Sequence, residues 1–408
     1  MTKKSDTPAI RFKGFTDTWE QRKFSELYEK VSRKNDLTYG KDDIISVANM
    51  YFKEDSYITD ESYLLTYNIF ELGDIAFEGN KSKNYAHGRF VENTIGNGIV
   101  SHVFDVFKPI MKPYDLQFWK YAINNEQLMG GILLRSTKAS TMMTNLVAND
   151  FLQETFLTPT YPEQQKIGAF FQQLDNLITL HQRKYDKLTN VKKSMLEKMF
   201  PKNGSNVPEI RFKGFTEAWE QRKLGEVGET YTGLSGKSKD DFGHGSGKFI
   251  TYMNVFSNPV ASSNMTEAIE IDDSQNKVQF GDVLFTTSSE TPDEVGMSSV
   301  WLENAENTYL NSFCFGYRPT TEYNPYYLAY MLRSSSMRKK ITFLAQGISR
   351  YNISKNKMMD IEMPIPSIDE QKQIGEYFRN LDNLITLHQR ELEKLKNIKK
   401  SCLENMFV

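Results

Sequence analysis

Four loop-like segments of this chain concentrate side chains that can hydrogen-bond to nucleic acid. They span 78–89 and 135–141 in the first half, and 286–291 and 346–352 in the second. Arg and Lys can pair with guanine, Asn and Gln with adenine, and Ser and Thr with phosphates or bases. The same residue types are common in ordinary solvated loops, and that alternative stays open for all four segments. The candidate DNA-binding residues are Lys81, Lys83, Arg89, Arg135, Lys138, Asn145, Ser288, Ser289, Arg350, Tyr351, Asn352 and Lys355.

The segment 346–355 is the most concentrated of these candidates. Arg350 supplies a base-reading fork, Tyr351 a stacking ring, Asn352 an amide and Lys355 a phosphate-binding charge. Alternatively, Tyr351 and Ile353 anchor the loop in the core while its charges are solvated.

Motifs that would indicate catalysis are incomplete. Residues 324–327 read Asn-Pro-Tyr-Tyr and resemble the Asn-Pro-Pro-Tyr/Phe motif of adenine methyltransferases. The third position holds Tyr instead of Pro, and no Gly-rich cofactor turn precedes the segment. Residues 243–248 resemble a phosphate loop, but Phe249 stands where Ser or Thr would bind magnesium. The five histidines show no metal-ligand spacing. The sequence therefore predicts a chain with no catalytic residues and no metal.

The composition is that of a globular protein with real cores, with 39% hydrophobic and 25% charged residues. A formal net charge of −2 argues against indiscriminate nucleic-acid binding, although a local basic face remains compatible with it. Neither the N-terminus nor any other segment has the apolar run of a secretory signal or a membrane span. The two cysteines, Cys314 and Cys402, have no Cys/His cluster near them, so we expect reduced thiols and a cytoplasmic protein.

Two internal repeats organise the chain. Residues 163–200 recur at 370–407 with 25 of 38 positions identical and LDNLITLHQR unbroken in both, and residues 8–23 recur at 208–223. The blocks between them, 24–159 and 224–366, have diverged but share landmarks such as GDIAF at 73–77 and GDVLF at 281–285. We therefore expect one mixed α/β fold used twice. Near-identical surfaces indicate one partner met twice, and differing surfaces indicate two targets.

Each long repeat is predicted to be a helix. Thr160 with Glu163, and Ser367 with Glu370, have the spacing of a capping box. Apolar positions then step 4-3-4-3, which is the period of a coiled-coil seam, and the chain order favours an antiparallel pair. His181, His388, Lys192 and Lys399 interrupt the seam. The central seam residues are Ile167, Phe171, Leu174, Ile178, His181, Ile374, Phe378, Leu381, Ile385 and His388.

Extra apolar residues widen the stripe of each helix. This face either meets a further protein or packs on the chain's own blocks. The extra residues are Phe170, Leu177, Leu180, Tyr377, Leu384 and Leu387.

This layout resembles the specificity subunit of a Type I restriction–modification enzyme. The similarity lies in two diverged blocks, each followed by a repeated helix opening P-x-x-EQ-x-x-I, here at 159–167 and 366–374, and in IRFKGF with WEQRK near the N-terminus. GDVLFTTSSE at 281–290 and GISRYNIS at 347–354 also fit. The resemblance implies target-recognition domains at 1–159 and 201–366, with a linker at 201–207, and spacer helices at 160–200 and 367–408.

The resemblance also implies roles and partners. Each recognition domain would read one half of a bipartite, asymmetric site in double-stranded DNA. The helices would set the spacing and dock two methyltransferase subunits, which restriction/translocase subunits would join. S-adenosylmethionine, ATP and magnesium would act on those partners, with no cofactor on this chain. Two alternatives remain open: a DNA-binding coiled-coil adaptor outside restriction, and a DNA methyltransferase.

Overall fold

The computed structural model describes residues 7–54, 58, 60–139, 143–202 and 204–408. The chain divides into two compact units. Unit 1 comprises residues 1–182 and 390–408, and unit 2 comprises residues 183–389. No helix among the described residues combines the length and apolarity needed to cross a membrane.

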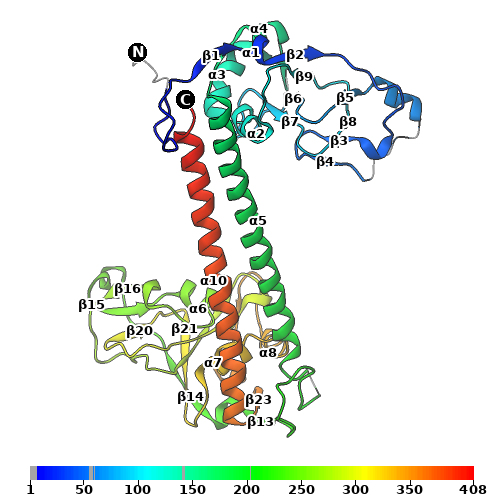
Figure 1. Cartoon of the computed structure of the whole chain (residues 1–408). Coiled ribbons are helices and arrows are strands. Elements are labelled where there is room, and N and C mark those ends of the chain that lie inside the picture. The colour runs from blue at the N-terminus through cyan, green and yellow to red at the C-terminus, as the bar shows by residue number, and fades with distance from the viewer. Residues whose placement is uncertain (1–6, 55–57, 59, 140–142, 203) are drawn as a thin grey trace. The chain divides into compact units, whose positions relative to one another are not determined.

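Unit 1 is a mixed α/β block (Figure 1). Its central antiparallel sheet has the strand order β2-β9-β6-β7, and β1-β12, β3-β4, β5-β8 and β10-β11 form two-stranded ribbons. The elements are β1 (Glu20–Lys23), α1 (Phe24–Leu27), β2 (Tyr28–Val31), β3 (Ile45–Ser46), β4 (Tyr51–Phe52), β5 (Asn68–Phe70), β6 (Ile75–Glu78), β7 (Arg89–Glu92), β8 (Gly98–Val100), β9 (Val106–Pro109), α2 (Leu116–Ile123), α3 (Glu126–Ser136), β10 (Thr137–Ala139), β11 (Thr144–Leu146), α4 (Ala148–Gln153) and β12 (Thr155–Thr158).

Unit 2 repeats this plan. Its central sheet has the order β14-β21-β17-β19, accompanied by the ribbons β13-β23 and β18-β22 and a sheet β16-β15-β20. The elements are β13 (Glu220–Lys223), β14 (Gly228–Thr232), β15 (Phe242–Ile250), α6 (Tyr252–Ser257), β16 (Thr266–Ile269), β17 (Val283–Thr286), β18 (Ser288–Ser289), β19 (Ser298–Val300), β20 (Thr308–Leu310), β21 (Cys314–Pro319), α7 (Pro325–Met331), α8 (Ser335–Thr342), β22 (Tyr351–Asn352), α9 (Lys355–Met359) and β23 (Glu362–Ile365).

The matched landmarks occupy matching places. GDIAF leads into β6 and GDVLF into β17, each the third strand in its sheet order, and β9 and β21 end at Pro109 and Pro319. Helices α2 and α7 also correspond, since Asp115 and Asn324 cap them by accepting hydrogen bonds from Phe118 N and Tyr327 N.

The long helices are α5 (Tyr161–Lys198) and α10 (Ile368–Asn405), each 38 residues long. They begin and end two residues earlier than the repeat boundaries. Ile167, Phe171 and Leu174 are buried in the core of unit 1, and Ile374, Phe378 and Leu381 in that of unit 2. Ile178, His181, Ile385 and His388 are half-buried. The seam spacing is therefore confirmed as a burial pattern.

The shorter repeat, at 8–23 and 208–223, joins the start of each block to the start of its long helix. β1 pairs antiparallel with β12, the strand before α5, and β13 pairs in the same way with β23, the strand before α10. Arg11 then donates to both carboxylate oxygens of Glu163, at 2.6 and 2.8 Å. Arg211 does the same to Glu370, at 2.7 and 2.8 Å.

These ion pairs correct the predicted capping boxes. Glu163 and Glu370 are buried and turn to the arginines, so the glutamate half of each box is wrong. The physical reason is that a buried carboxylate is stabilised more by a bidentate guanidinium than by one backbone N–H. The Ser367 half holds, since Glu370 N donates to Ser367 Oγ at 3.4 Å.

The two lysines in the seam, Lys192 and Lys399, form ion pairs with aspartates of the other long helix. In unit 1, Lys399 Nζ lies 2.5 Å from Asp175 Oδ1, and Tyr121 OH donates to Asp175 Oδ2 at 2.7 Å. In unit 2, Lys192 and Tyr330 meet Asp382 at 2.5 and 2.8 Å. Within each unit the two helix segments run antiparallel, and this pair of charges holds their register.

Candidate DNA interface

The two donor-rich segments of unit 1 come together. Thr144 N at the start of β11 donates to Gly79 O at 2.8 Å, and Asn80 bridges Met143. A Cβ at Gly79 would lie 2.2 Å from Thr144 O, so only glycine allows this approach. Segments that are far apart in the sequence therefore share one edge of the unit.

The predicted residues of unit 1 fall into two groups. Lys81, Lys83, Lys138 and Asn145 are exposed, and Lys138 stands opposite Asn145 in the β10–β11 ribbon. Arg89 and Arg135 are instead paired with carboxylates, Arg89 with Glu78 at 2.7 Å and Arg135 with Glu154 at 2.5 and 2.8 Å. Ser140 and Thr141 of the predicted segment lie outside the described residues.

Unit 2 brings its two segments together at the corresponding place. β18 pairs with β22, so that Ser288 stands opposite Asn352 and Ser289 opposite Tyr351. Gln346 and Asn352 exchange two backbone hydrogen bonds of 3.0 and 2.9 Å, which closes a hairpin. Gly347, at a φ of +147°, permits this turn, because a Cβ there would lie 2.0 Å from Arg350 O.

Some of the predicted side chains on this hairpin and its partner strand are exposed, and others are buried. Arg350 and Asn352 are exposed, and Lys355 is half-buried at the first position of α9. Tyr351 packs partly against the core and Ile353 is buried, as the anchoring alternative expected. Ser288 and Ser289 are buried, with Ser289 Oγ donating to Glu294 at 3.2 Å. All twelve residues remain predictions as DNA contacts.

Two half-buried arginines support this edge of unit 2, and sequence reasoning missed them. Arg338 donates to the carbonyls of Asp293, Val295 and Gly296, and Arg333 donates to four further carbonyls. Burial lowers the pKa of both guanidiniums to about 10. No spacing marks such residues, because their partners are backbone oxygens of distant segments.

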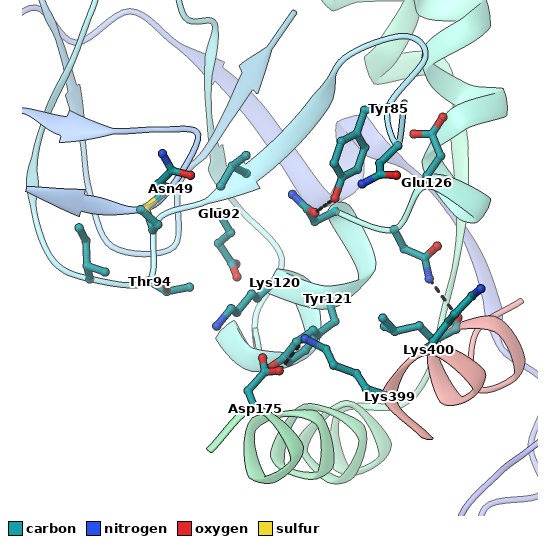
Figure 2. Close-up of a pocket in the computed structure, with 17 residues that line it drawn as sticks. Asn49, Tyr85, Glu92, Thr94, Lys120, Tyr121, Glu126, Asp175, Lys399 and Lys400 are labelled. Carbon is teal, nitrogen blue, oxygen red and sulfur yellow. Dashed lines mark hydrogen bonds and ion pairs between the residues drawn. The ribbon is translucent and has the colours of Figure 1, made fainter. Parts of the chain in front are cut away.

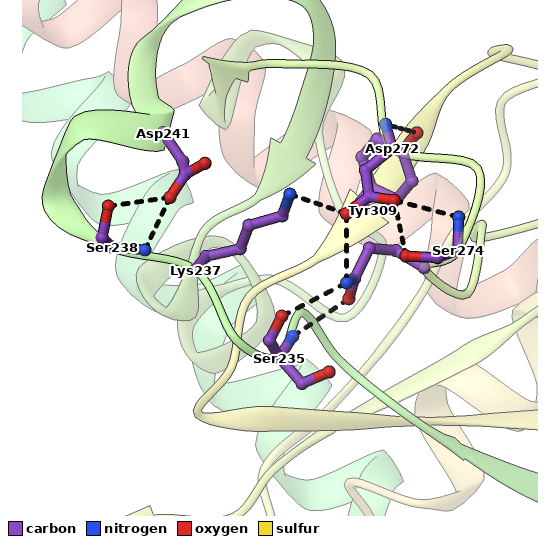
Figure 3. A network of polar contacts seen from close by, with 8 residues as sticks. Ser235, Lys237, Ser238, Asp241, Asp272, Ser274 and Tyr309 are labelled. Carbon is purple, nitrogen blue, oxygen red and sulfur yellow. Dashed lines mark hydrogen bonds and ion pairs between the residues drawn. The ribbon is translucent and has the colours of Figure 1, made fainter.

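A second polar network braces the outer loops of unit 2 (Figure 3). Lys237 Nζ binds Asp272 Oδ2 at 2.7 Å, and Asp272 N donates to Tyr309 OH at 3.0 Å. Hydrogen bonds, first from Lys237 and then from Ser274, hold the pKa of Asp272 well below its usual range. These contacts fix the loop before β15 and the loop after β16 to β20, and so position the surface of this block.

Comparisons with known proteins find similarity to one family. Residues 216–397 match the family model of the Type I restriction modification DNA specificity domain. The chain is 24% identical over 272 residues to the Type I restriction enzyme MjaVIII specificity subunit of Methanocaldococcus jannaschii, covering 60% of this chain and 59% of that relative. In both comparisons the chain is similar to the specificity subunits of Type I restriction–modification systems.

A further specificity subunit matches over a shorter extent. The StySPI specificity subunit of Salmonella potsdam is 32% identical over 124 residues, 30% of this chain and 27% of that subunit. The chain therefore aligns with less than two-thirds of the length of these relatives.

Solved structures agree on the fold. The S subunit of a Type I system from M. genitalium superimposes with a TM-score of 0.53 at 14% identity, covering 98% of this chain and 99% of that one. A structure described as bearing on complex assembly and conformational transition of the type I R-M system gives 0.50 at 17% identity, covering 95% and 97%. The specificity-subunit fold thus spans nearly the whole chain.

Proposed function

We propose that this chain is the DNA-recognition subunit of a Type I restriction–modification complex. Each block reads one half of a bipartite, asymmetric site in double-stranded DNA, and the helices set the spacing between the halves. One observation carries the proposal. The same two loops are brought together at the same place in both units, yet their side chains differ, as expected of one fold that reads two different targets.

The helices supply the proposed docking sites for partners. Leu177 and Leu180 on α5, and Leu384 and Leu387 on α10, are 43–51% exposed at repeated positions. Phe170 and Tyr377 are instead covered by Phe12 and Phe212, with ring centroids 5.7 and 6.0 Å apart. Two equal exposed patches favour two copies of one partner, which we assign to methyltransferase subunits.

The proposed role is non-catalytic. Methyl transfer from S-adenosylmethionine, and ATP- and magnesium-dependent translocation and cleavage, belong to the methyltransferase and restriction subunits, with no cofactor on this chain. We place the complex in the cytoplasm, where its DNA substrate is found. The family match does not favour the coiled-coil adaptor or the fused methyltransferase.

Methylome sequencing tests this proposal. Cells carrying the chain and its methyltransferase partner should show adenine methylation in one bipartite motif. Replacing residues 224–366 with the block of a relative should then change one half of the motif and leave the other half and the gap unchanged. Methylation by the isolated chain would contradict the non-catalytic role, and a change in both halves would contradict modular recognition.

A further inference from the structure

Unit 1 contains a cavity of about 890 Å³, and none of the predicted DNA-binding residues lines it (Figure 2). Asn49, Glu92 and Tyr85 line its upper part in the figure, and Lys120, Tyr121 and Lys399 its lower part. Lys400 and Leu403 of α10 complete it on one side. The cavity therefore borders both the block and the helix pair of this unit.

Glu92 brings an unsatisfied polar atom to this cavity. Its side chain is buried, with the residue only 3% exposed, and its Oε1 accepts a hydrogen bond from Tyr114 OH. Its Oε2 has no hydrogen-bond partner among the described residues, and the carboxyl points toward Lys120 in Figure 2. Burial raises the pKa of Glu92 well above its usual range, which favours the protonated acid, a hydrogen-bond donor.

The lining of the cavity holds three lysines, Lys120, Lys399 and Lys400, and three carboxyl groups, Glu92, Glu126 and Asp175. The ammonium groups of Lys120 and Lys399 lie 5.4 and 5.3 Å from the ring centroid of Tyr121. Asp175 neutralises Lys399, but Lys120 forms no ion pair with any described residue. Glu126 lies across the cavity, where Ala86 N donates to it at 3.4 Å.

Unit 2 provides an internal comparison. Tyr330, Asp382 and Lys192 reproduce the arrangement of Tyr121, Asp175 and Lys399, yet Ala329 precedes Tyr330 where Lys120 precedes Tyr121. In the central sheets, Glu92 stands opposite Ile75 of β6, whereas Val300 stands opposite Val283 of β17. The fold therefore does not require the Glu92–Lys120 combination, and only unit 1 has it.

We propose that this cavity binds a phosphate group. Lys120 and the exposed Lys400 supply the attraction, and the free oxygen of Glu92 donates a hydrogen bond once protonated. An ammonium group without an ion pair, on Lys120, and an unsatisfied buried carboxyl oxygen, on Glu92, together fit a tetrahedral anion better than a cation. The phosphate comes either from the DNA backbone, in which case the inference rests on the proposed function, or from a free nucleotide.

Lys120→Ala in the full chain, assembled with its partners, tests the DNA source. Affinity should fall about 3- to 10-fold for cognate and non-cognate duplexes alike, and the slope of log affinity against log salt should fall by about one. Lys120→Arg should keep both values. Lys108→Ala, an exposed lysine on β9, is the matched control and should leave the slope unchanged.

Inorganic phosphate tests the other source. At matched ionic strength, phosphate should raise the melting temperature of the wild-type complex but not that of Lys120→Ala. If Lys120→Ala weakens DNA binding, the ligand is a phosphate of the DNA backbone. If Lys120→Ala abolishes only the stabilisation by inorganic phosphate, the ligand is free phosphate. If neither measurement separates Lys120→Ala from wild type, the inference is wrong. Wild-type preference for cognate DNA, measured in the same titrations, tests the proposed function separately.

Discussion

Phe407, which follows the last turn of α10, stacks on Phe171 of α5 with ring centroids 5.8 Å apart and planes at 27°. Phe200, just after α5, stacks in the same way on Phe378 of α10, at 5.8 Å and 20°. Both pairs lie inside the core of their own unit. The end of each long helix is therefore part of the core that surrounds the start of the other.

This stacking makes the last residues of the chain a determinant of stability. Phe407→Ala should lower the free energy of unfolding of unit 1 by about 3–5 kcal/mol, because it opens a cavity in a packed aromatic cluster. Phe343→Ala is the control, since Phe343 is 88% exposed and should change stability by no more than about 0.5 kcal/mol. Equal losses in chemical denaturation for both variants would refute the packing assignment.

The ion pair between Lys399 and Asp175 should set helix register. Asp175→Lys and Lys399→Asp should each destabilise the chain, because each places like charges together in a half-buried site. The double variant should recover part of the loss, with a coupling energy of about 0.5–3 kcal/mol in a double-mutant cycle. Lys394→Asp, on the exposed side of α10, serves as a single-charge control. A coupling energy near zero would exclude a role in register.

The buried face of α10 should determine stability, and its exposed face should determine assembly with partners. Leu381→Asp buries an unpaired charge at a position that is 7% exposed and should lower the melting temperature strongly. Leu384→Asp, three residues on and 44% exposed, should melt like wild type but lose methyltransferase subunits in size-exclusion chromatography. Full assembly of Leu384→Asp would remove this patch from the proposed interface.

The hairpin at 346–352 should contribute base specificity. Arg350→Ala should cost about 1–3 kcal/mol on cognate DNA and relax one position of a half-site. Lys355→Ala should weaken all sequences alike and flatten the salt dependence. Gly347→Ala should reproduce the Arg350→Ala defect, because its Cβ collides with Arg350 O. Unchanged mismatch penalties in all three variants would place the hairpin outside the interface.

The repeats and the apolar period made the helices predictable to within two residues, and the doubled α/β fold followed from shared landmarks. Long-range polar partners were not predictable. Lys399 appeared to be a polar break in the seam because its partner, Asp175, lies 224 positions away. Glu163 fitted a local capping rule, yet Arg11, 152 positions away, takes both of its oxygens.

In the candidate interface, too, local features were predictable and long-range contacts were not. Polar composition located the four segments, but only the fold shows that they meet in pairs. Composition also could not separate exposed Lys81 and Arg350 from Arg135, which is tied to Glu154, or from Ser288, which is buried. Burial and pairing depend on strands such as β18 and β22, whose register no local pattern specifies.

The pairing of β1 with β12, and of β13 with β23, has a genetic consequence. Each block enters and leaves its unit through adjacent strands, so its interior can be exchanged without moving the points where the chain enters and leaves. The flanking segments repeat in the sequence, with 25 of 38 positions identical between 163–200 and 370–407 and 13 of 16 between 8–23 and 208–223. If the coding DNA is equally repetitive, homologous recombination within these flanks would shuffle whole blocks between the two halves or between related genes. The product would retain the Arg11–Glu163 and Arg211–Glu370 ion pairs and the helix ends while acquiring a new target.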